Sequence, residues 1–217
     1  MGRRKNRLAA KLRAFCLGAR RILNPLTPLL TGLAGLFAAE NRVGGMQSAR
    51  ALLDAAARPV ALAHQTTPPL GGALAQCLAG DPHPLTPLIR QAAPYLKWVF
   101  SQLDGRIRDE IALGMMQAEL IGPGALFESD AVSIGLFVQS PDLDYVTRQH
   151  AAEESFFMLG GLGLWTAGDG PEHAETAGAQ IHHPSMMPHA SRTAKMPLLA
   201  AWRWTGDISV EQYTLKG

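Results

Sequence analysis

Cysteine is nearly absent from this chain. Cys16 and Cys77 are the two cysteines in 217 residues, and neither belongs to a Cys-x-x-Cys pair. A disulfide-stapled scaffold and a cysteine-bound zinc finger are therefore not expected, and a reducing, cytoplasmic location is the default prediction. The hydrophobic fraction of 47% and the charged fraction of 18% are typical of a folded globular protein.

The chain also lacks an unbroken apolar run long enough to cross a membrane. Its most apolar stretch, residues 22–39, is interrupted by Pro25, Pro28 and two glycines. A spanning helix needs about 20 consecutive apolar residues, so no stable membrane span is expected. Export is the alternative, because basic residues precede this run and small residues end it, as in a signal peptide.

Acidic residues are missing from the N-terminal part. Eight Lys and Arg residues precede Glu40, and no acid does, whereas the remainder holds 12 basic and 18 acidic residues. The body of the protein is thus acidic by about six charges, which argues against a nucleic-acid partner. The basic residues 1–13 are predicted to form a solvated helix, with a targeting segment or an amphipathic helix on an anionic membrane surface as alternatives.

The composition changes near residue 105. The first part is rich in Ala and Leu at helical spacing, and the later part has short aromatic or β-branched runs bounded by turn residues. We therefore predict a basic segment and helical layer over residues 1–104, and a mainly β barrel over 105–217. The predicted helices are 46–57, 70–79 and 88–100, and the predicted strands are 133–139, 155–159, 163–165, 197–204 and 210–215.

Five of the seven histidines fall in the predicted barrel. His150 and Glu154 stand four positions apart in front of an apolar run, and His189 follows in a second polar stretch. Imidazole nitrogen and carboxylate oxygen suit zinc, iron, manganese or nickel, and three such groups hold an ion more firmly than two. The sequence therefore predicts a cofactor, one divalent metal ion (Zn, Fe, Mn or Ni).

The order and spacing of these groups resemble the two motifs of cupin barrels, G-x5-H-x-H-x3-4-E-x6-G and G-x5-P-x-G-x2-H-x3-N. The resemblance implies a cupin fold, a double-stranded β-helix or jelly-roll barrel. Its matching positions are His150, Glu154, Gly161, Gly178, Pro184 and His189. The chain departs from the motifs at Asp142, Arg148, Met186 and Thr193, where the pattern has Gly, His, Gly and Asn.

Longer stretches resemble the cupin-type dimethylsulfoniopropionate (DMSP) lyases, across roughly residues 95–215. They include A-E-L-I-G-P, H-A-A-E-E, I-H-H-P-S-M-M-P-H-A and L-L-A-A-W-R-W-T-G-D-I. The resemblance implies a metal-dependent lyase that cleaves DMSP to dimethyl sulfide and acrylate by β-elimination. It also implies that His150, Glu154 and His189 are the metal ligands, and that Tyr145 matches a family tyrosine. The family tyrosine that contacts the metal and is implicated as base is replaced here by Phe156.

The chemistry of β-elimination assigns roles to further residues. Tyr145 is the predicted catalytic base, because Phe156 cannot take a proton. Arg148 is predicted to fork onto the substrate carboxylate, and Phe156 and Trp202 to accept the sulfonium by cation–π attraction. Weaker candidates for the base are Glu153, His182 and His183, and strand alternation argues against both histidines facing the pocket. Other candidates for the aromatic wall are Phe157, Trp165 and Trp204.

Several alternatives stay open at this point. Because of Phe156 and Arg148, the metal site also fits an oxygenase or isomerase acting on another small carboxylate, or a non-catalytic cupin that binds such an acid. Arg148 could equally be a structural ion-pair partner of Glu153 or Asp144, and His173 is predicted to be solvated in a loop. The expected partner is a small-molecule substrate, and a homodimer is compatible with the sequence.

Overall fold

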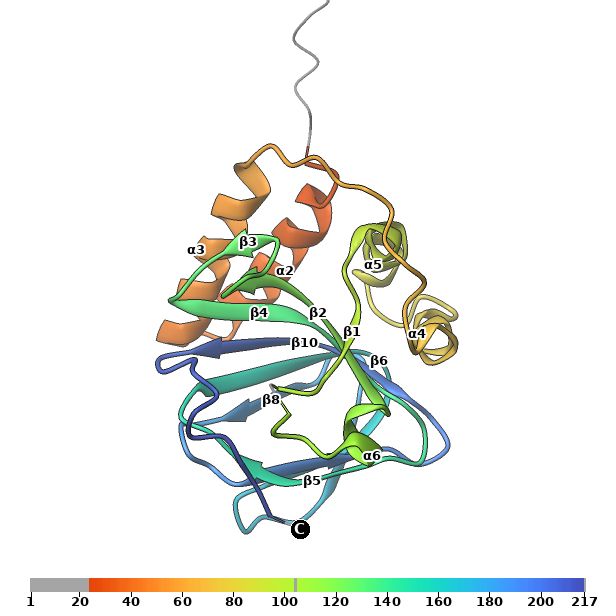
Figure 1. Cartoon of the computed structure of the whole chain (residues 1–217), viewed down its shortest axis with the longest axis vertical. Coiled ribbons are helices and arrows are strands. Elements are labelled where there is room, and N and C mark those ends of the chain that lie inside the picture. The colour runs from red at the N-terminus through yellow and green to blue at the C-terminus, as the bar shows by residue number, and fades with distance from the viewer. Residues whose placement is uncertain (1–23, 104, 217) are drawn as a thin grey trace, which may run out of the picture.

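The computed structural model describes residues 24–103 and 105–216 of the chain. The basic segment at residues 1–13 and Cys16 lie outside the described residues. Within the described residues, four helices precede the sheet and gather on one side of it (Figure 1). They are α2 (Thr27–Ala39), α3 (Val43–Ala57), α4 (Gly71–Leu78) and α5 (Thr86–Ala92), followed by the 3-10 turn η1 (Ala93–Tyr95) and later by the short α6 (Asp109–Ala112).

Within the described part of the chain, eleven strands form one curled sheet. Its order is β1-β2-β4-β10-β6-β9-β5-β11, with β3 beside β2 and both β7 and β8 beside β6. All pairs are antiparallel except β2 with β3. The strands are β1 (Val99–Phe100), β2 (Met115–Gly122), β3 (Phe127–Glu128), β4 (Val132–Gln139), β5 (Asp144–Gln149), β6 (Glu153–Ala167), β7 (His173–Thr176), β8 (Gln180–His183), β9 (His189–Arg192), β10 (Leu198–Thr205) and β11 (Thr214–Leu215).

Strand β6 joins the two halves of the barrel. Its first half pairs with β10 and β8, and its second half pairs with β7 and β9. The change occurs around Gly160 and Gly161. Gly161 has a φ of 75°, and a Cβ there would stand 1.8 Å from the carbonyl oxygen of Pro197. This bend requires glycine, because an L side chain would both strain the backbone and collide with the neighbouring strand.

Two apolar clusters explain the alternating side chains of the strands. In β10, Leu199 and Ala201 point to the cluster under the helices, whereas Ala200, Trp202 and Trp204 point into the barrel. Successive strand residues face opposite sides of a sheet, so one strand serves both clusters. The cluster under the helices also contains Leu29, Leu30, Leu33 and Phe37 of α2.

Most elements predicted from the sequence are present, with three differences. The predicted helix over 88–100 ends at Ala92, where Pro94 cannot continue it, and the chain enters the sheet at Val99. The strands predicted at 155–159 and 163–165 are one strand, β6, and the strand predicted at 210–215 is shortened to Thr214–Leu215. The division of the chain at residues 104 and 105 stays a prediction.

The apolar stretch at residues 22–39 becomes helix α2 from Thr27 onward. Its residues Leu29, Leu30 and Leu33 are buried in the cluster under the helices, and the helix packs mainly on α3, which accounts for its apolar character. Among the described residues, no helix is long and apolar enough to cross a membrane.

Candidate metal centre

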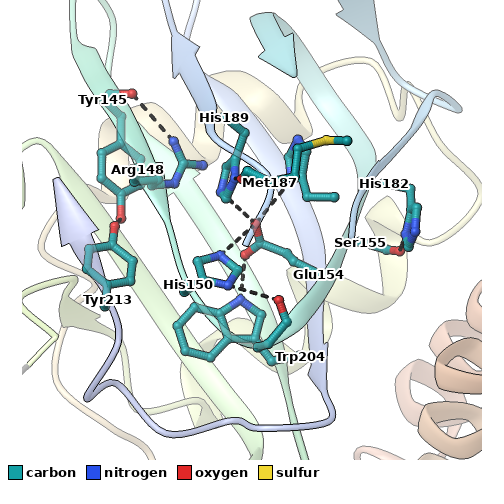
Figure 2. A network of polar contacts seen from close by, with 12 residues as sticks. Tyr145, Arg148, His150, Glu154, Ser155, His182, Met187, His189, Trp204 and Tyr213 are labelled. Atoms are coloured by element: carbon teal, nitrogen blue, oxygen red, sulfur yellow. Dashed lines mark hydrogen bonds and ion pairs between the residues drawn. The ribbon is translucent and has the colours of Figure 1, made fainter. Parts of the chain in front are cut away.

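Three side chains converge inside the barrel. His150 follows β5, Glu154 lies in β6 and His189 begins β9, and their ligand atoms all lie within 4.8 Å of one another. Nε2 of His150 is 3.5 Å and Nε2 of His189 is 3.2 Å from Oε2 of Glu154. All three side chains are buried, and Figure 2 shows them pointing toward one point. The structure thus brings together the three residues that the sequence predicted to lie close to one another.

The tautomers of His150 and His189 follow from the contacts of their Nδ1 atoms. Nδ1 of His150 lies 3.0 Å from the carbonyl oxygen of Ala152, and Nδ1 of His189 lies 2.8 Å from that of Met187. A carbonyl oxygen only accepts hydrogen bonds, so each Nδ1 carries the proton and each Nε2 presents a lone pair. Neither Nε2 has a hydrogen-bond partner among residues 24–103 and 105–216.

The charges around this point favour a cation. Burial lowers the pKa of His189 to about 3, so its ring is neutral near neutral pH. Burial raises the pKa of Glu154, but the neighbouring His150 and the hydrogen bond with His183 outweigh it and bring that pKa well below the usual range. Two lone pairs and a carboxylate oxygen therefore face one another. This donor set fits a divalent metal ion, and a bound ion would relieve their repulsion.

Two further side chains hold Glu154 in place. Trp204 donates its indole N–H to Oε1 of Glu154 at 2.6 Å, and Nδ1 of His183 lies 3.2 Å from Oε2. His183 is fully buried, and its ring stacks on that of His189 at 4.0 Å. Its neighbour His182 points to the other face, where it is 3.1 Å from the hydroxyl of Ser155. Strand alternation had predicted that the two histidines do not share a face.

A second polar group lies beside the three candidate ligands and consists of Tyr145, Arg148 and Tyr213 (Figure 2). The hydroxyls of Tyr145 and Tyr213 are hydrogen-bonded, and the Arg148 guanidinium lies 3.8 Å above the Tyr145 ring. The ring of Tyr213 stacks parallel to that of His150 at 5.9 Å. Burial raises the pKa of the Tyr145 phenol, while Arg148 and the hydrogen bond with Tyr213 oppose this shift.

A cavity of about 840 Å³ connects the two groups with the outside. Its apolar walls include Phe137, Phe156 and Trp202, and Glu119 supplies a carboxyl group bonded to Ser133. Nη2 of Arg148 and Nε1 of Trp202 are buried at this cavity and have no hydrogen-bond partner in the described part of the chain. The cavity thus offers unused donors, aromatic faces and carboxyl groups to a small molecule. Its lining also includes Tyr145, His150, Glu154, Trp204 and Tyr213.

The DMSP lyase family profile matches residues 45–200 of the chain. This chain belongs to the DMSP lyase family. The lyase DddQ of Ruegeria pomeroyi is 36% identical to it over 89 residues, which cover 41% of this chain and 44% of that protein. In this comparison the chain therefore spans less than half of the length of the curated relative.

Solved structures of DMSP lyases share the fold. The crystal structure of DddQ from Ruegeria pomeroyi DSS-3 matches with a TM-score of 0.59 and 26% identity, over 89% of this chain and 97% of that chain. A chain from the crystal structures of the lyases RdDddP and RnDddQII also gives 0.59, at 20% identity, over 88% and 100%. The predicted cupin barrel with an N-terminal helical layer is confirmed.

Several expectations for this DMSP lyase family member need correction. Arg148 pairs with neither Glu153 nor Asp144 among the described residues, and Glu153 lies on the outer face, 2.7 Å from Nη2 of Arg203. Because Glu153 lies on the outer face, it cannot act as a base in the cavity. His173 belongs to strand β7, although it is exposed as predicted and lies 2.8 Å from Glu175.

The aromatic candidates divide between the two sides of the sheet. Phe156, Trp202 and Trp204 line the cavity, whereas Phe157 packs against Phe37 of the helical layer. Trp165 is fully buried in the barrel core and is not among the residues that line the cavity.

Sequence reasoning did not find Glu119 or Tyr213, and it ranked His183 too low. The alternation in β2 carried a signal for Glu119, because Ala118 and Leu120 face the helices and Glu119 therefore faces inward. The position of Tyr213 depends on a loop that returns to the barrel mouth, and no local pattern predicts that contact.

Proposed function

We propose that this chain is a metal-dependent lyase that cleaves DMSP to dimethyl sulfide and acrylate by β-elimination. The observation that carries the proposal is that one cavity is lined both by candidate metal ligands and by the polar group of Tyr145, Arg148 and Tyr213. The Nε2 atoms of His150 and His189, which have no hydrogen-bond partner among the described residues, and the carboxylate of Glu154 lie beside a phenol and the partnerless Nη2 of a guanidinium group. Membership of the DMSP lyase family supports the substrate, and the proposed partner is this small molecule. A homodimer stays a prediction.

The proposed cofactor is one divalent ion, Zn, Fe, Mn or Ni, held by His150, Glu154 and His189. A bound ion of this kind would supply an electrophile toward the substrate carboxylate and the enolate-like charge that develops beside it. Three protein ligands leave a position open for a substrate oxygen. Two imidazole nitrogens and one carboxylate oxygen are compatible with each of these metals.

Arg148 and Tyr145 are the proposed substrate-binding and catalytic residues at the carboxylate end. Nη2 of Arg148 is buried and available for a carboxylate oxygen, since guanidinium is a permanent cation with several donors. Tyr145 acts in its phenolate form, which the Arg148 guanidinium over its ring and a bound cation would stabilise, and the phenolate oxygen takes the proton from the substrate α-carbon. The C–H electron pair becomes the double bond of acrylate, and the bond from the β-carbon to sulfur breaks with its electrons leaving on dimethyl sulfide.

The opposite end of the substrate carries a sulfonium cation. Phe156 and Trp202 are the proposed binding residues for it, since aromatic faces attract cations that lie within about 6 Å. Their strands are adjacent, with Trp202 directly opposite Phe156 in the register. Glu119 faces the same cavity two strands further on and adds a carboxylate that favours a positive charge.

Headspace detection of dimethyl sulfide tests the proposal. Purified protein given DMSP should release the sulfide, lose that activity on chelation and regain it with one equivalent of a divalent ion. Tyr145→Phe should retain the metal and lose about 10²-fold or more of the rate, as expected for a missing base.

Two outcomes would contradict the lyase assignment. Metal-loaded protein that binds DMSP without releasing sulfide would be a non-catalytic binding cupin. Metal-loaded protein that neither binds nor cleaves DMSP would point to another small carboxylate and to oxygenase or isomerase chemistry, which Fe(II) and oxygen consumption would then test.

A further inference from the structure

Oε2 of Glu154 is surrounded by three imidazole rings, not two. Nδ1 of His183 stands at 3.2 Å, the same distance as Nε2 of His189, and Nε2 of His150 stands at 3.5 Å. The cupin motifs contain no counterpart of His183, which comes from strand β8. Its contacts within the barrel indicate its role.

The register of the sheet places His183 on the ligand face. In the pairing of β6 with β8, His183 lies directly opposite Glu154, and His182 lies opposite Ser155. Side chains of directly opposed residues share a face. His183 therefore projects into the barrel beside Glu154, and His182 projects to the outer face.

Hydrogen-bond chemistry separates His183 from the other two rings. His150 and His189 use their Nδ1 protons on backbone carbonyls, so their Nε2 atoms have no proton to give to Glu154. The Nδ1 of His183 faces the carboxylate itself, which accepts and cannot donate when ionised. His183 is therefore the ring that donates an N–H to Oε2.

We propose that His183 is a positioning residue that, together with Trp204, fixes the carboxylate of Glu154 for metal binding. Trp204 donates to Oε1 at 2.6 Å and His183 to Oε2 at 3.2 Å, so both oxygens are tethered. A tethered carboxylate keeps its remaining lone pairs aimed at the point where the ligand atoms of His150 and His189 meet. The groups that orient metal ligands in this way commonly contribute 10–100-fold to metal affinity or activity.

His183 also restrains a second ligand. Its ring lies nearly parallel to that of His189, with centroids 4.0 Å apart and planes 11° apart. Because the Nδ1 of His189 is tied to Met187 on one side, this stacking leaves the His189 ring little freedom to rotate. The loss of the His183 ring would therefore loosen two of the three proposed ligands.

Two substitutions of nearly equal size test the donor role. In His183→Asn, the side-chain amide nitrogen takes approximately the position of Nδ1 and can still donate to Glu154. His183→Leu has a similar volume and no donor. The matched control is His182→Leu, which changes the neighbouring histidine on the outer face.

The measurement is the affinity of each full-length protein for Zn²⁺, by competition with a chromophoric chelator. We expect His183→Leu to bind about 10–100-fold more weakly than the wild type. His183→Asn should recover part of this loss, because it restores the donor to Glu154 but not the ring stacked on His189, and His182→Leu should bind as the wild type does. Thermal unfolding of the metal-free proteins verifies that the variants are folded.

A Co²⁺ absorption spectrum distinguishes a positioning role from direct ligation. The metal bands of the Co²⁺-loaded His183→Asn protein should match those of the wild type, because the same three ligands are present. Changed bands in this variant would overturn the proposal and make His183 a ligand itself.

The inference rests on the proposed metal site, and the two can fail separately. Wild-type protein without measurable affinity for divalent ions would overturn both. Equal Zn²⁺ affinities for the wild type and His183→Leu would overturn the role of His183 alone, whatever the activity toward DMSP.

Discussion

Nη2 of Arg203 lies 2.5 Å from Oε2 of Glu40, which joins the end of helix α2 to strand β10 across 163 positions of sequence. Both side chains are fully buried, and Arg203 also contacts Glu153 at 2.7 Å. Glu153 directly precedes the proposed ligand Glu154, on the opposite face of the strand. This ion pair thus fastens the helical layer to the back of the candidate metal centre.

The substitution Glu40→Gln should destabilise the protein by about 3 kcal/mol, because it leaves a buried guanidinium with less compensation. Urea unfolding measures this loss. The matched control is Asp81→Asn, which removes the 2.7 Å pair with Arg90, where both side chains are about half exposed. An exposed pair contributes at most about 1 kcal/mol. Equal losses in the two variants would show that burial does not decide the strength of these pairs.

The proposed ligand His189 gives a second prediction. His189→Ala should remove the metal and all sulfide release, because two ligands hold a divalent ion weakly. Metal analysis after gel filtration measures the content. His173→Ala is the control, since His173 is an exposed strand histidine bonded to Glu175, and its loss should change neither quantity. Full metal content in His189→Ala would refute the ligand set.

Arg148 provides a test of carboxylate binding. Arg148→Lys keeps the positive charge but loses the planar guanidinium, which can bind a carboxylate through two N–H groups. The KM for DMSP should rise by about 10-fold or more, which corresponds to the loss of one charged hydrogen bond. Steady-state kinetics at constant metal loading measure the change. Arg192→Lys is the control, because Arg192 forms an exposed pair with Glu172 and does not line the cavity. An unchanged KM in Arg148→Lys would remove Arg148 from the substrate site.

Glu119 should make substrate binding depend on pH. Burial raises the pKa of this carboxyl group, although the hydrogen bond with Ser133 opposes the shift. The carboxyl group is therefore charged above its raised pKa and becomes neutral on acidification sooner than an ordinary glutamate. We expect the KM for DMSP to rise as the pH falls through that value. Glu119→Gln should have a raised KM at neutral pH and a flatter pH profile; identical profiles would contradict the contact with the sulfonium.

Cys77 should be inert in the folded protein. Its side chain is buried under the sheet, and burial raises the pKa of the thiol to about 12. Because the thiolate is the reactive form, a Cys16→Ser variant should not react with a disulfide reagent at about pH 8 until it is unfolded. Absorbance of the released thiol follows the reaction. Rapid labelling of the native protein would indicate that helix α4 opens readily beside Gly160.

The sequence alone was enough to predict the general fold and the three proposed ligands. His150 and Glu154 are only four positions apart in the sequence, so their pairing is a local feature. His189 stands at the histidine position of the second cupin motif. Alternation in β6 predicted that Phe156 shares the face of Glu154 and that Phe157 does not, and the structure agrees. The predicted faces are correct because a strand has a period of two, so the faces of neighbouring residues follow from the chain itself.

Only the tertiary structure decided which distant groups meet at those faces. The pairing of β6 with β8 places His183 on Glu154, and the C-terminal return of the chain brings Tyr213 to Tyr145. The pairing of Glu40 with Arg203 likewise depends on how the helical layer packs on the sheet. Register and packing depend on the sum of many weak contacts over the whole barrel, and no local spacing encodes them.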